Sequence, residues 1–290
     1  MKQKHLFILI IAICWQFQAF GKAAFLSGYD DLVTPKHHIK LQVKLEKKSL
    51  IPYRSDLPGE TIHFYLNDML LGSDVTDDEG IAYLSYQALP VGAYKFRAKI
   101  DKKSRYKTPA AELYHLVIDE NQPIVISDID HTLSDASAIR VATRSNRSIK
   151  PLVNAANGIQ FFQDKGFQIV YLTARDDTFI LKTKAWLSMY DFLKAPSFYW
   201  DYKGAGIPQD HGDFKSLVIK NFRLKFNNIM IGIGDKPHDI RAYRDHGLRS
   251  YYIGKPGEVI DEDAIRVGSW DAILEHFKSH PLGSLNTDPK

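Results

Sequence analysis

The hydrophobic pattern of this 290-residue chain changes its period near residue 122, and this change limits the folds open to it. Between residues 37 and 120, apolar and polar residues alternate in short runs, as in IKLQVKL at 39–45. Turn signals such as LPG at 57–59 separate the runs. Period-two runs at this spacing predict a small all-β sandwich. We place this first domain at residues 30–120.

After residue 122 the pattern predicts alternating strands and helices. Strands are expected at 124–128, 168–172, 197–200, 229–234 and 250–253, and helices at 151–165, 179–190, 213–226 and 237–246. Pro151 suits a helix start, and Gly166 and Gly247 suit helix ends. Continuous apolar strands in this order indicate an α/β fold with a doubly wound parallel sheet, which we place at residues 121–280.

Polar side chains follow the predicted strands at the carboxyl edge of the sheet, where ligands of such sheets bind. Asp128 and Asp130 follow the first strand, Thr173 and Arg175 the second, Lys215 opens the helix after the third, and Asp235 follows the fourth. Two neighbouring carboxylates cost stability unless a cation or catalytic work compensates. One strand-end Asp is often only a helix cap. The joint order D-x-D-x-T, T, K and G-D-x-x-x-D predicts a functional site.

Four motifs carry a resemblance to a known superfamily: DIDHTLSD at 128–135, YLTARDD at 171–177, Phe214-Lys215 and GDKPHDIRAY at 234–243. Together they resemble the haloacid dehalogenase superfamily of phosphotransferases across residues 122–255. Within that superfamily they are similar to the catalytic domain of lipins and related phosphatidate phosphatases. The chain departs from lipins at two positions, because it has His131 where they usually carry Gly and Asp235 where they usually carry Asn.

The resemblance implies a haloacid dehalogenase-like, Rossmannoid fold and hydrolysis of a phosphomonoester through an aspartyl-phosphate. Asp128 would be the nucleophile. Asp130 would protonate the leaving oxygen and later activate water. Thr173 and Lys215 would hold the oxygens of the transferring phosphoryl group.

The same resemblance implies Mg²⁺ as the cofactor, since this hard cation takes oxygen ligands and bridges carboxylates to phosphate. Asp128 and Asp235 would bind the metal, and Asp130 would face it with its main-chain carbonyl. Asp239 would orient the water shell of the metal.

The segments 134–167 and 174–214 are short and are needed for core helices and strands, so we expect no large cap domain over the site. An open site suits a phosphate on a large substrate, and the likeness to lipins favours phosphatidate at a membrane surface, with peripheral membrane contact. The stretch LTARDDTF…KAWL also resembles the phosphatase half of polynucleotide kinases, so a nucleic-acid 3′-phosphatase or nucleotidase stays open. A third alternative is a catalytically silent phospholipid-binding module, against which the retained aspartates argue.

Four side chains near the motifs are candidates for substrate contact: Thr132, Arg140, Arg144 and Arg175. The basic loop that carries two of them could equally be solvated. His131 stays open between substrate contact and outward packing.

The first 21 residues predict a secretory signal peptide, because Lys2 and Lys4 precede an apolar run and AFG at 19–21 offers a cleavage site. We therefore expect an exported protein, periplasmic or secreted. The only cysteine, Cys14, lies in this segment, so no disulfide partner is expected. The formal net charge is +4, and +2 without the two lysines, which is too small to indicate nucleic-acid binding.

The segment TDDEGIAYLSYQALPVGAYKF at 76–96 resembles immunoglobulin-like repeats of exported proteins. Its acidic residues, Asp77 to Glu79, fit a hairpin turn better than a calcium site. Only residues 119–123 join this domain to the first strand of the α/β domain, so the sandwich should lie close to that domain. We expect it to supply docking or cover rather than chemistry, or else to complete the fold.

Overall fold

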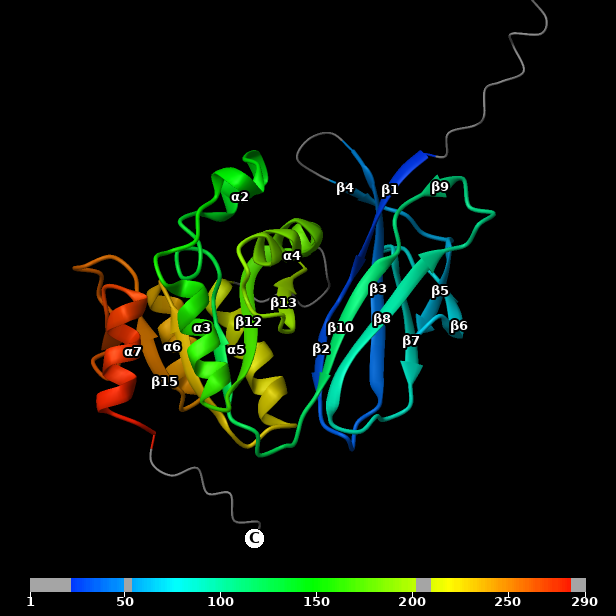
Figure 1. Ribbon diagram of the computed structural model, residues 1–290. Helices are drawn as coiled ribbons and strands as arrows, with labels where there is room; N and C mark the ends of the chain where they lie inside the picture. The colour runs from blue at the N-terminus through cyan, green and yellow to red at the C-terminus, as the bar shows by residue number, and fades with distance from the viewer. Residues whose placement is uncertain (1–21, 50–53, 202–209, 283–290) are drawn as a thin grey trace, which may run out of the picture.

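The computed structural model describes residues 22–49, 54–201 and 210–282, which form a strand-rich half and an α/β half (Figure 1). The predicted signal peptide lies outside the described residues. The strand-rich half contains β1 (Lys22–Gly28), β2 (Asp31–Val33), β3 (Ile39–Lys48), β4 (Arg54–Asp56), β5 (Thr61–Leu66), β6 (Met69–Val75), β7 (Ile81–Tyr86), β8 (Gly92–Ile100), β9 (Tyr106–Lys107) and β10 (Ala111–Val117). One sheet has the order β4-β3-β1-β9 with β7 also paired to β3, and the other has the order β2-β10-β8-β5-β6.

The two sheets enclose one hydrophobic core, as the alternating pattern predicts. Ile39, Leu41, Val43 and Leu45 of β3 are all fully buried in it. The predicted start at residue 30 is too late, because β1 pairs with β3 from Ala24 to Gly28. This strand was missed because it directly follows the segment assigned to the signal peptide. At the predicted acidic turn, Asp77 Oδ1 accepts hydrogen bonds from the backbone nitrogens of Glu79 and Ile81 at 3.0 and 2.9 Å.

The α/β half is a doubly wound parallel sheet, which confirms the predicted fold class. Its elements are β11 (Ile124–Ser127), α2 (Ala138–Thr143), η2 (Asn146–Ser148), α3 (Ala155–Asp164), β12 (Gln168–Asp176), η3 (Asp177–Phe179), α4 (Ile180–Met189), β13 (Ser197–Trp200), α5 (His211–Arg223), β14 (Ile229–Gly234), α6 (Pro237–Asp245), β15 (Arg249–Tyr252), β16 (Ile265–Arg266) and α7 (Trp270–Ser279). The strand order is β13-β12-β11-β14-β15-β16, with every pair parallel. Within the described ranges, no helix combines the length and the apolar character that crossing a membrane requires.

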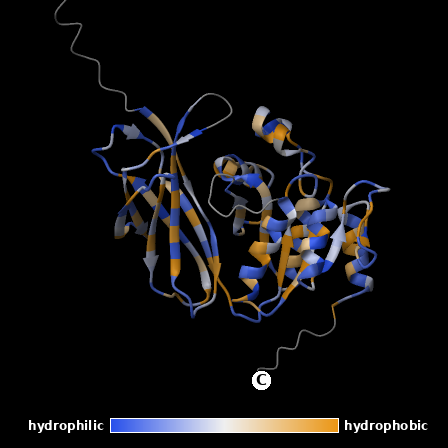
Figure 2. Ribbon diagram, turned by 180° about the vertical axis from the view of Figure 1, so that it is seen from behind, coloured by the Kyte–Doolittle hydropathy of each residue, from blue (hydrophilic) through white to orange (hydrophobic). Residues whose placement is uncertain are grey.

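The central strands of this sheet bury residues on both faces. Val125 of β11 packs in the cluster that contains α3 and α7 residues, whereas Ile124 and Ile126 pack in the cluster that contains α5 and α6 residues. Figure 2 shows this difference between the halves: the central strands of the α/β half are mainly hydrophobic, and the sandwich strands alternate. Continuous apolar strands are therefore explained by helices on both faces of the sheet.

The first helix after the motif loop begins later than predicted. Pro151 forms an isolated antiparallel bridge with Ser134, and Leu152 N donates to the carbonyl of Leu133 at 2.8 Å. Asn154 then takes a left-handed conformation with φ of 61°, and α3 starts at Ala155. Pairing with the motif loop thus overrides the preference of proline for the first helical turn, and segment 149–152 supports the loop that carries Asp128.

The sandwich also contributes to the core of the α/β half. Leu32 of β2 and Ile118, which follows β10, are buried in the same cluster as Ile124 and Ile229. Figure 1 shows β2 and β10 beside the α/β half, with α4 close to the sandwich strands. The two halves therefore share apolar burial in addition to the short link.

His115 predicts an acid sensitivity of the folded protein. It is fully buried in β10 and packs edge-on against Phe96, with ring centroids 5.1 Å apart. Burial, assisted by the charge of Lys184, lowers the pKa of His115 to about 3. The unfolded chain takes up this proton near pH 6.5, roughly the pKa of a free histidine, so unfolding is favoured increasingly as the pH falls from 6.5 towards 3.

We expect His115→Phe to flatten the dependence of the free energy of unfolding on pH below 6.5, by up to about 1.4 kcal/mol per pH unit. Urea unfolding at pH 7.5, 6 and 5 measures it. Exposed His38 supplies the control variant His38→Gln, which should keep the wild-type slope. Equal slopes for all three proteins would contradict this role of His115.

Candidate active site

Asp128 directly follows β11, which pairs with β14 at the centre of the sheet. Its backbone nitrogen donates to the carbonyl of Ile233 at 2.9 Å, so the chain keeps the ladder with β14 for one residue beyond β11. The following turn is held from inside, because Ile129 and Leu133 are fully buried and Trp270 Nε1 donates to the carbonyl of Thr132 at 2.8 Å. These contacts fix the motif loop on rigid elements, as a precise site requires.

Three carboxylates meet at this edge of the sheet. Oxygen atoms of Asp128, Asp235 and Asp239 all lie within 4.8 Å of one another, and all three residues are buried. Lys215 of α5 completes the cluster: its Nζ lies 2.7 Å from Asp128 Oδ1 and 2.6 Å from Asp239 Oδ1. The structure thus brings together four residues that the sequence placed on three separate motifs.

The charges of the cluster do not balance. Burial raises the pKa of Asp128 to about 8; the charge of Lys215 opposes this rise, and those of Asp239, Asp235 and Asp130 add to it. Burial also raises the pKa of Asp235. For Lys215, burial acts to lower the pKa, but the charges of Asp128 and Asp239 outweigh it and hold the pKa well above the usual range. One buried ammonium therefore faces three buried carboxylates.

This donor set fits Mg²⁺. It offers only hard carboxylate oxygens, and a dication would neutralise the charge that Lys215 leaves uncompensated. Gly234 shows how closely the cluster is packed, since a Cβ there would lie 2.9 Å from Asp239 Oδ2. The residues that could hold the metal are Asp128, Asp235 and Asp239. Asp130 is predicted to face the metal with its main-chain carbonyl. Its side chain points to a different partner, Arg175.

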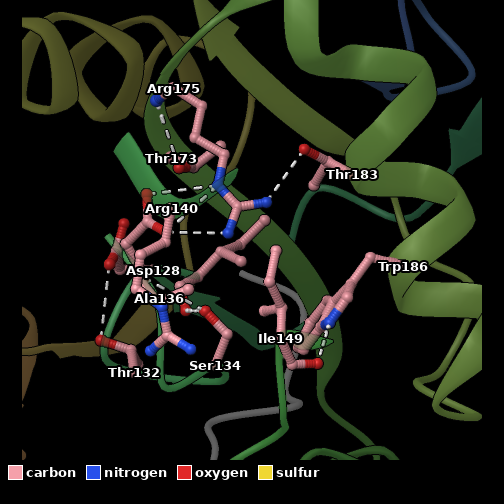
Figure 3. Close-up of polar contacts among 12 residues, drawn as sticks. Asp128, Thr132, Ser134, Ala136, Arg140, Ile149, Thr173, Arg175, Thr183 and Trp186 are labelled. Atoms are coloured by element: carbon pink, nitrogen blue, oxygen red, sulfur yellow. Dashed lines mark hydrogen bonds and ion pairs between the residues drawn. The ribbon is translucent and has the colours of Figure 1, made fainter. Parts of the chain in front are cut away.

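Arg175 holds the carboxylate of Asp130. Its Nη2 donates to Asp130 Oδ1 at 2.8 Å and its Nε donates to Oδ2 at 3.2 Å. Arg175 Nη1 donates to the hydroxyl of Thr183 on α4 at 3.0 Å, and Figure 3 shows its guanidinium directed towards that hydroxyl. Thr173 Oγ1 accepts from the backbone nitrogen of Arg175 at 3.3 Å. Arg175, expected to contact substrate, is thus a buried partner of the predicted general acid.

The other predicted substrate contacts divide into two groups. Thr132 is buried and donates from Oγ1 to Asp128 Oδ2 at 3.4 Å, so it belongs to the cluster. Arg140 and Arg144 are exposed, and no hydrogen bond or ion pair within the described residues joins either guanidinium to the three carboxylates. Arg140 instead donates to the carbonyl of Asp135 at 2.8 Å. Contact of Arg140 and Arg144 with a bound substrate stays a prediction.

A hollow of about 530 Å³ opens beside the cluster at Asp235. His131, with φ of 52°, lines it together with apolar Val153 and with Lys236 and Lys255. Lys236 Nζ lies 2.7 Å from Asp235 Oδ2. Lys236 was not predicted from the sequence, although its position directly after Asp235 was a usable signal. The hollow places His131 on the open side of the site.

The comparisons with known proteins identify similar domains. The family model for the LNS2 domain of PITM 1-3 matches residues 125–254. Membrane-associated phosphatidylinositol transfer protein 1 of Rattus norvegicus is 26% identical over 217 residues, which cover 72% of this chain and 16% of that protein. Membrane-associated phosphatidylinositol transfer protein 3 of Homo sapiens is 23% identical over 220 residues, which cover 73% of this chain and 20% of that protein. The chain thus spans less than a quarter of the length of either relative.

Two solved structures are also similar. D,D-heptose 1,7-bisphosphate phosphatase from B. bronchiseptica, complexed with magnesium and phosphate, has 13% identity and a TM-score of 0.43, covering 54% of this chain and 98% of that one. The Pnkp1/Rnl/Hen1 RNA repair complex has 17% identity and a TM-score of 0.40, covering 48% and 45%. Over residues 125–254, then, this chain is similar to LNS2 domains, and its α/β half has the haloacid dehalogenase-like architecture expected from its motifs.

Proposed function

We propose that this protein is an Mg²⁺-dependent phosphatase that hydrolyses a phosphomonoester of a phospholipid, with phosphatidate as the first candidate. The observation that carries the proposal is the buried cluster of Asp128, Asp235 and Asp239 around Lys215 at the carboxyl edge of the sheet. Such an arrangement leaves excess negative charge next to one strong cation, which suits the binding of a dication and a phosphate together.

The reaction would proceed in two steps. A carboxylate oxygen of Asp128 attacks phosphorus, the ester P–O bond breaks, and the leaving oxygen takes a proton from Asp130. Water then attacks the aspartyl-phosphate while Asp130 accepts its proton, the P–O bond to Asp128 breaks, and inorganic phosphate leaves. Both carboxyl groups return to their starting states.

The remaining residues of the site support these steps. Lys215 and Thr173 would hold phosphoryl oxygens, and Asp128, Asp235 and Asp239 would hold Mg²⁺. The metal supplies charge compensation for the phosphoryl group when it is bound. Arg175 orients Asp130 through its two hydrogen bonds.

Exposed apolar side chains around the site support a lipid substrate. Ile139 on α2 is 76% exposed, Val153 at the hollow is 79% exposed and Val259 in the loop after β15 is 89% exposed. All three follow carboxyl ends of the sheet strands, and α2 projects beyond the α/β half (Figure 1). Exposed Arg144 and Lys255 lie in the same loops. Apolar tips among cations suit peripheral contact with an anionic bilayer.

The names of the relatives support lipid chemistry and also keep a second candidate open. Both relatives are phosphatidylinositol transfer proteins, so a phospholipid-binding module without turnover is the alternative. The intact set of Asp128, Asp130, Asp235 and Lys215 favours turnover. The segment proposed as a signal peptide would place this reaction in the periplasm or outside the cell.

A phosphate-release assay with Mg²⁺ tests the proposal across four substrates: phosphatidate in vesicles, dispersed short-chain phosphatidate, a 3′-phosphorylated oligonucleotide and an aryl phosphate. We expect the highest efficiency with phosphatidate and no release in excess chelator. Highest efficiency with the oligonucleotide would assign the nucleic-acid alternative. Vesicle binding without release from any substrate would assign the binding module and reject the phosphatase.

Asp130→Asn tests the assignment of the general acid. We expect a loss of about 10²- to 10⁴-fold in turnover of an alkyl phosphate, whose leaving oxygen needs a proton. The first chemical step with an aryl phosphate should be affected far less, because its leaving oxygen is stable without protonation. Burst-phase kinetics separate this step from the second. Equal losses in the first step for both substrates would contradict the role of Asp130.

A further inference from the structure

A buried ion pair joins the sandwich to the segment that follows β12. Lys44 of β3 lies with its Nζ 2.9 Å from Asp177 Oδ2, and both side chains are 2% exposed. The same Nζ lies 3.4 Å from Asp201 Oδ1, just after β13. For Lys44, burial acts to lower the pKa, but the neighbouring carboxylates outweigh it and raise the pKa, so the ammonium stays charged. The sandwich thus inserts a cation into the α/β half.

Tyr29 adds a second contact from the sandwich to the same carboxylate. Its hydroxyl donates to Asp177 Oδ2 at 2.5 Å. Burial and the charge of Asp177 raise the pKa of Tyr29 well above its usual value, so the hydroxyl keeps the proton that it donates. Lys44 from β3 and Tyr29, which directly follows β1, therefore hold one oxygen of Asp177.

Asp177 lies two residues after Arg175, the residue that binds Asp130. The intervening Asp176 caps η3 by accepting from the backbone nitrogen of Thr178 at 2.9 Å, so the chain between them is ordered by its own hydrogen bond. Two residues span at most about 7 Å, so Asp177 and Arg175 belong to one short stretch of backbone. Lys44 and Tyr29 thus contact Asp177, Arg175 contacts the carboxylate of Asp130, and the backbone through Asp176 joins the two sets of contacts.

We propose that Lys44 and Tyr29 are positioning residues of the phosphatase site, which act by fixing Asp177 and thereby Arg175 against Asp130. The inference deepens the proposed function and rests on it. It assigns the sandwich a role in the chemical step: the domain supplies no catalytic group, but it completes the support of the general acid. A buried ion pair adds little net stability over an apolar pair, so its effect should be found in geometry.

The test uses Tyr29→Phe in the full-length protein, since this change removes one hydroxyl and leaves Lys44 paired with Asp177. Ser197→Ala is the matched control. Ser197 Oγ donates to Asp30 Oδ2 at 2.9 Å, so it is also a buried hydroxyl that binds a carboxylate across the two halves. It lies at the opposite end of β13 from Asp201.

For Tyr29→Phe we expect kcat for an alkyl phosphate to fall about tenfold with KM unchanged, because a misplaced catalytic group slows the chemical step. The first chemical step with an aryl phosphate, read from the burst phase, should change less than about twofold, since it does not need the proton of Asp130. When Tyr29→Phe is added to the Asp130→Asn variant, kcat should fall no further than in Asp130→Asn alone. Ser197→Ala should leave all these values near wild type.

Amide hydrogen exchange provides a readout that does not depend on turnover. Segment 173–179 should exchange faster in Tyr29→Phe than in wild type and in Ser197→Ala, at equal melting temperature. Unchanged exchange of this segment, or equal losses in the first step with both phosphate esters, would overturn the positioning role. If wild type releases no phosphate from any substrate, the proposed function fails, while the exchange data still decide whether Tyr29 holds the segment.

Discussion

Asp128→Asn should reduce phosphate release by about 10³-fold or more, because it removes the proposed nucleophile and a charged metal ligand while keeping the shape of the side chain. Steady-state kinetics with dispersed phosphatidate measure this loss. The fold should survive. Burial and the neighbouring carboxylates raise the pKa of Asp128 to about 8, so between roughly pH 4 and 8 its ionisation costs stability as the pH rises. Asparagine avoids that cost.

Asp213→Asn is the matched control for this variant. Asp213 is exposed in the first turn of α5, the helix that carries Lys215, and it should tolerate the change with full activity. Thermal unfolding without divalent ions should show Asp128→Asn to be at least as stable as wild type at neutral pH. An active Asp128→Asn protein would contradict the assignment, and an unfolded one would contradict the account of the electrostatics.

Lys215→Met should cost about 3–5 kcal/mol of stability without divalent ions, because it leaves the buried carboxylates of Asp128 and Asp239 without their shared ammonium. The loss should shrink as the pH is lowered, since protonation removes buried negative charge. Activity should also be lost, as no ammonium remains beside Asp128. Urea unfolding at pH 8 and pH 5.5 measures the effect on stability.

The exposed Lys220 on the same helix provides the control variant Lys220→Met, which should stay within about 0.5 kcal/mol of wild type. Added Mg²⁺ should restore more stability to Lys215→Met than to this control, because the cation replaces the missing charge. Equal stability of the two variants without Mg²⁺ would show that the carboxylates do not depend on Lys215.

The sequence predicted the sheet and the cluster because both depend on local signals. Apolar strands followed by acidic residues place Asp128 and Asp235 at one edge of any parallel sheet, and helix spacing brings Asp239 to the same side. The start of α3 was mispredicted for a different reason. Pro151 pairs with Ser134 across the motif loop, and this long-range contact has no signal in the helix pattern.

Lys44 shows most clearly what a periodic pattern leaves open. In β3 the alternation places Val43 and Leu45 inside the sandwich and Lys44 outside it, which is correct. The alternation of apolar and polar residues does not show whether the outer face of β3 contacts water or another domain. Here it meets Asp177, so Lys44 is buried although the pattern assigns it to the surface. The polar contacts between the halves could therefore be found only in three dimensions.

The most direct test of the central claim, turnover through Asp128, is to trap the phosphorylated residue in the Asp130→Asn variant. With an aryl phosphate and Mg²⁺, the first step needs no proton from residue 130, whereas the second step lacks its general base and should stall. Acid quenching and peptide mass spectrometry should then find one phosphoryl group on Asp128 in the peptide that contains residues 124–135. The label should be absent when Asp128→Asn is added. If the wild-type protein releases phosphate but this peptide carries no phosphoryl group in the Asp130→Asn variant, turnover through Asp128 is contradicted.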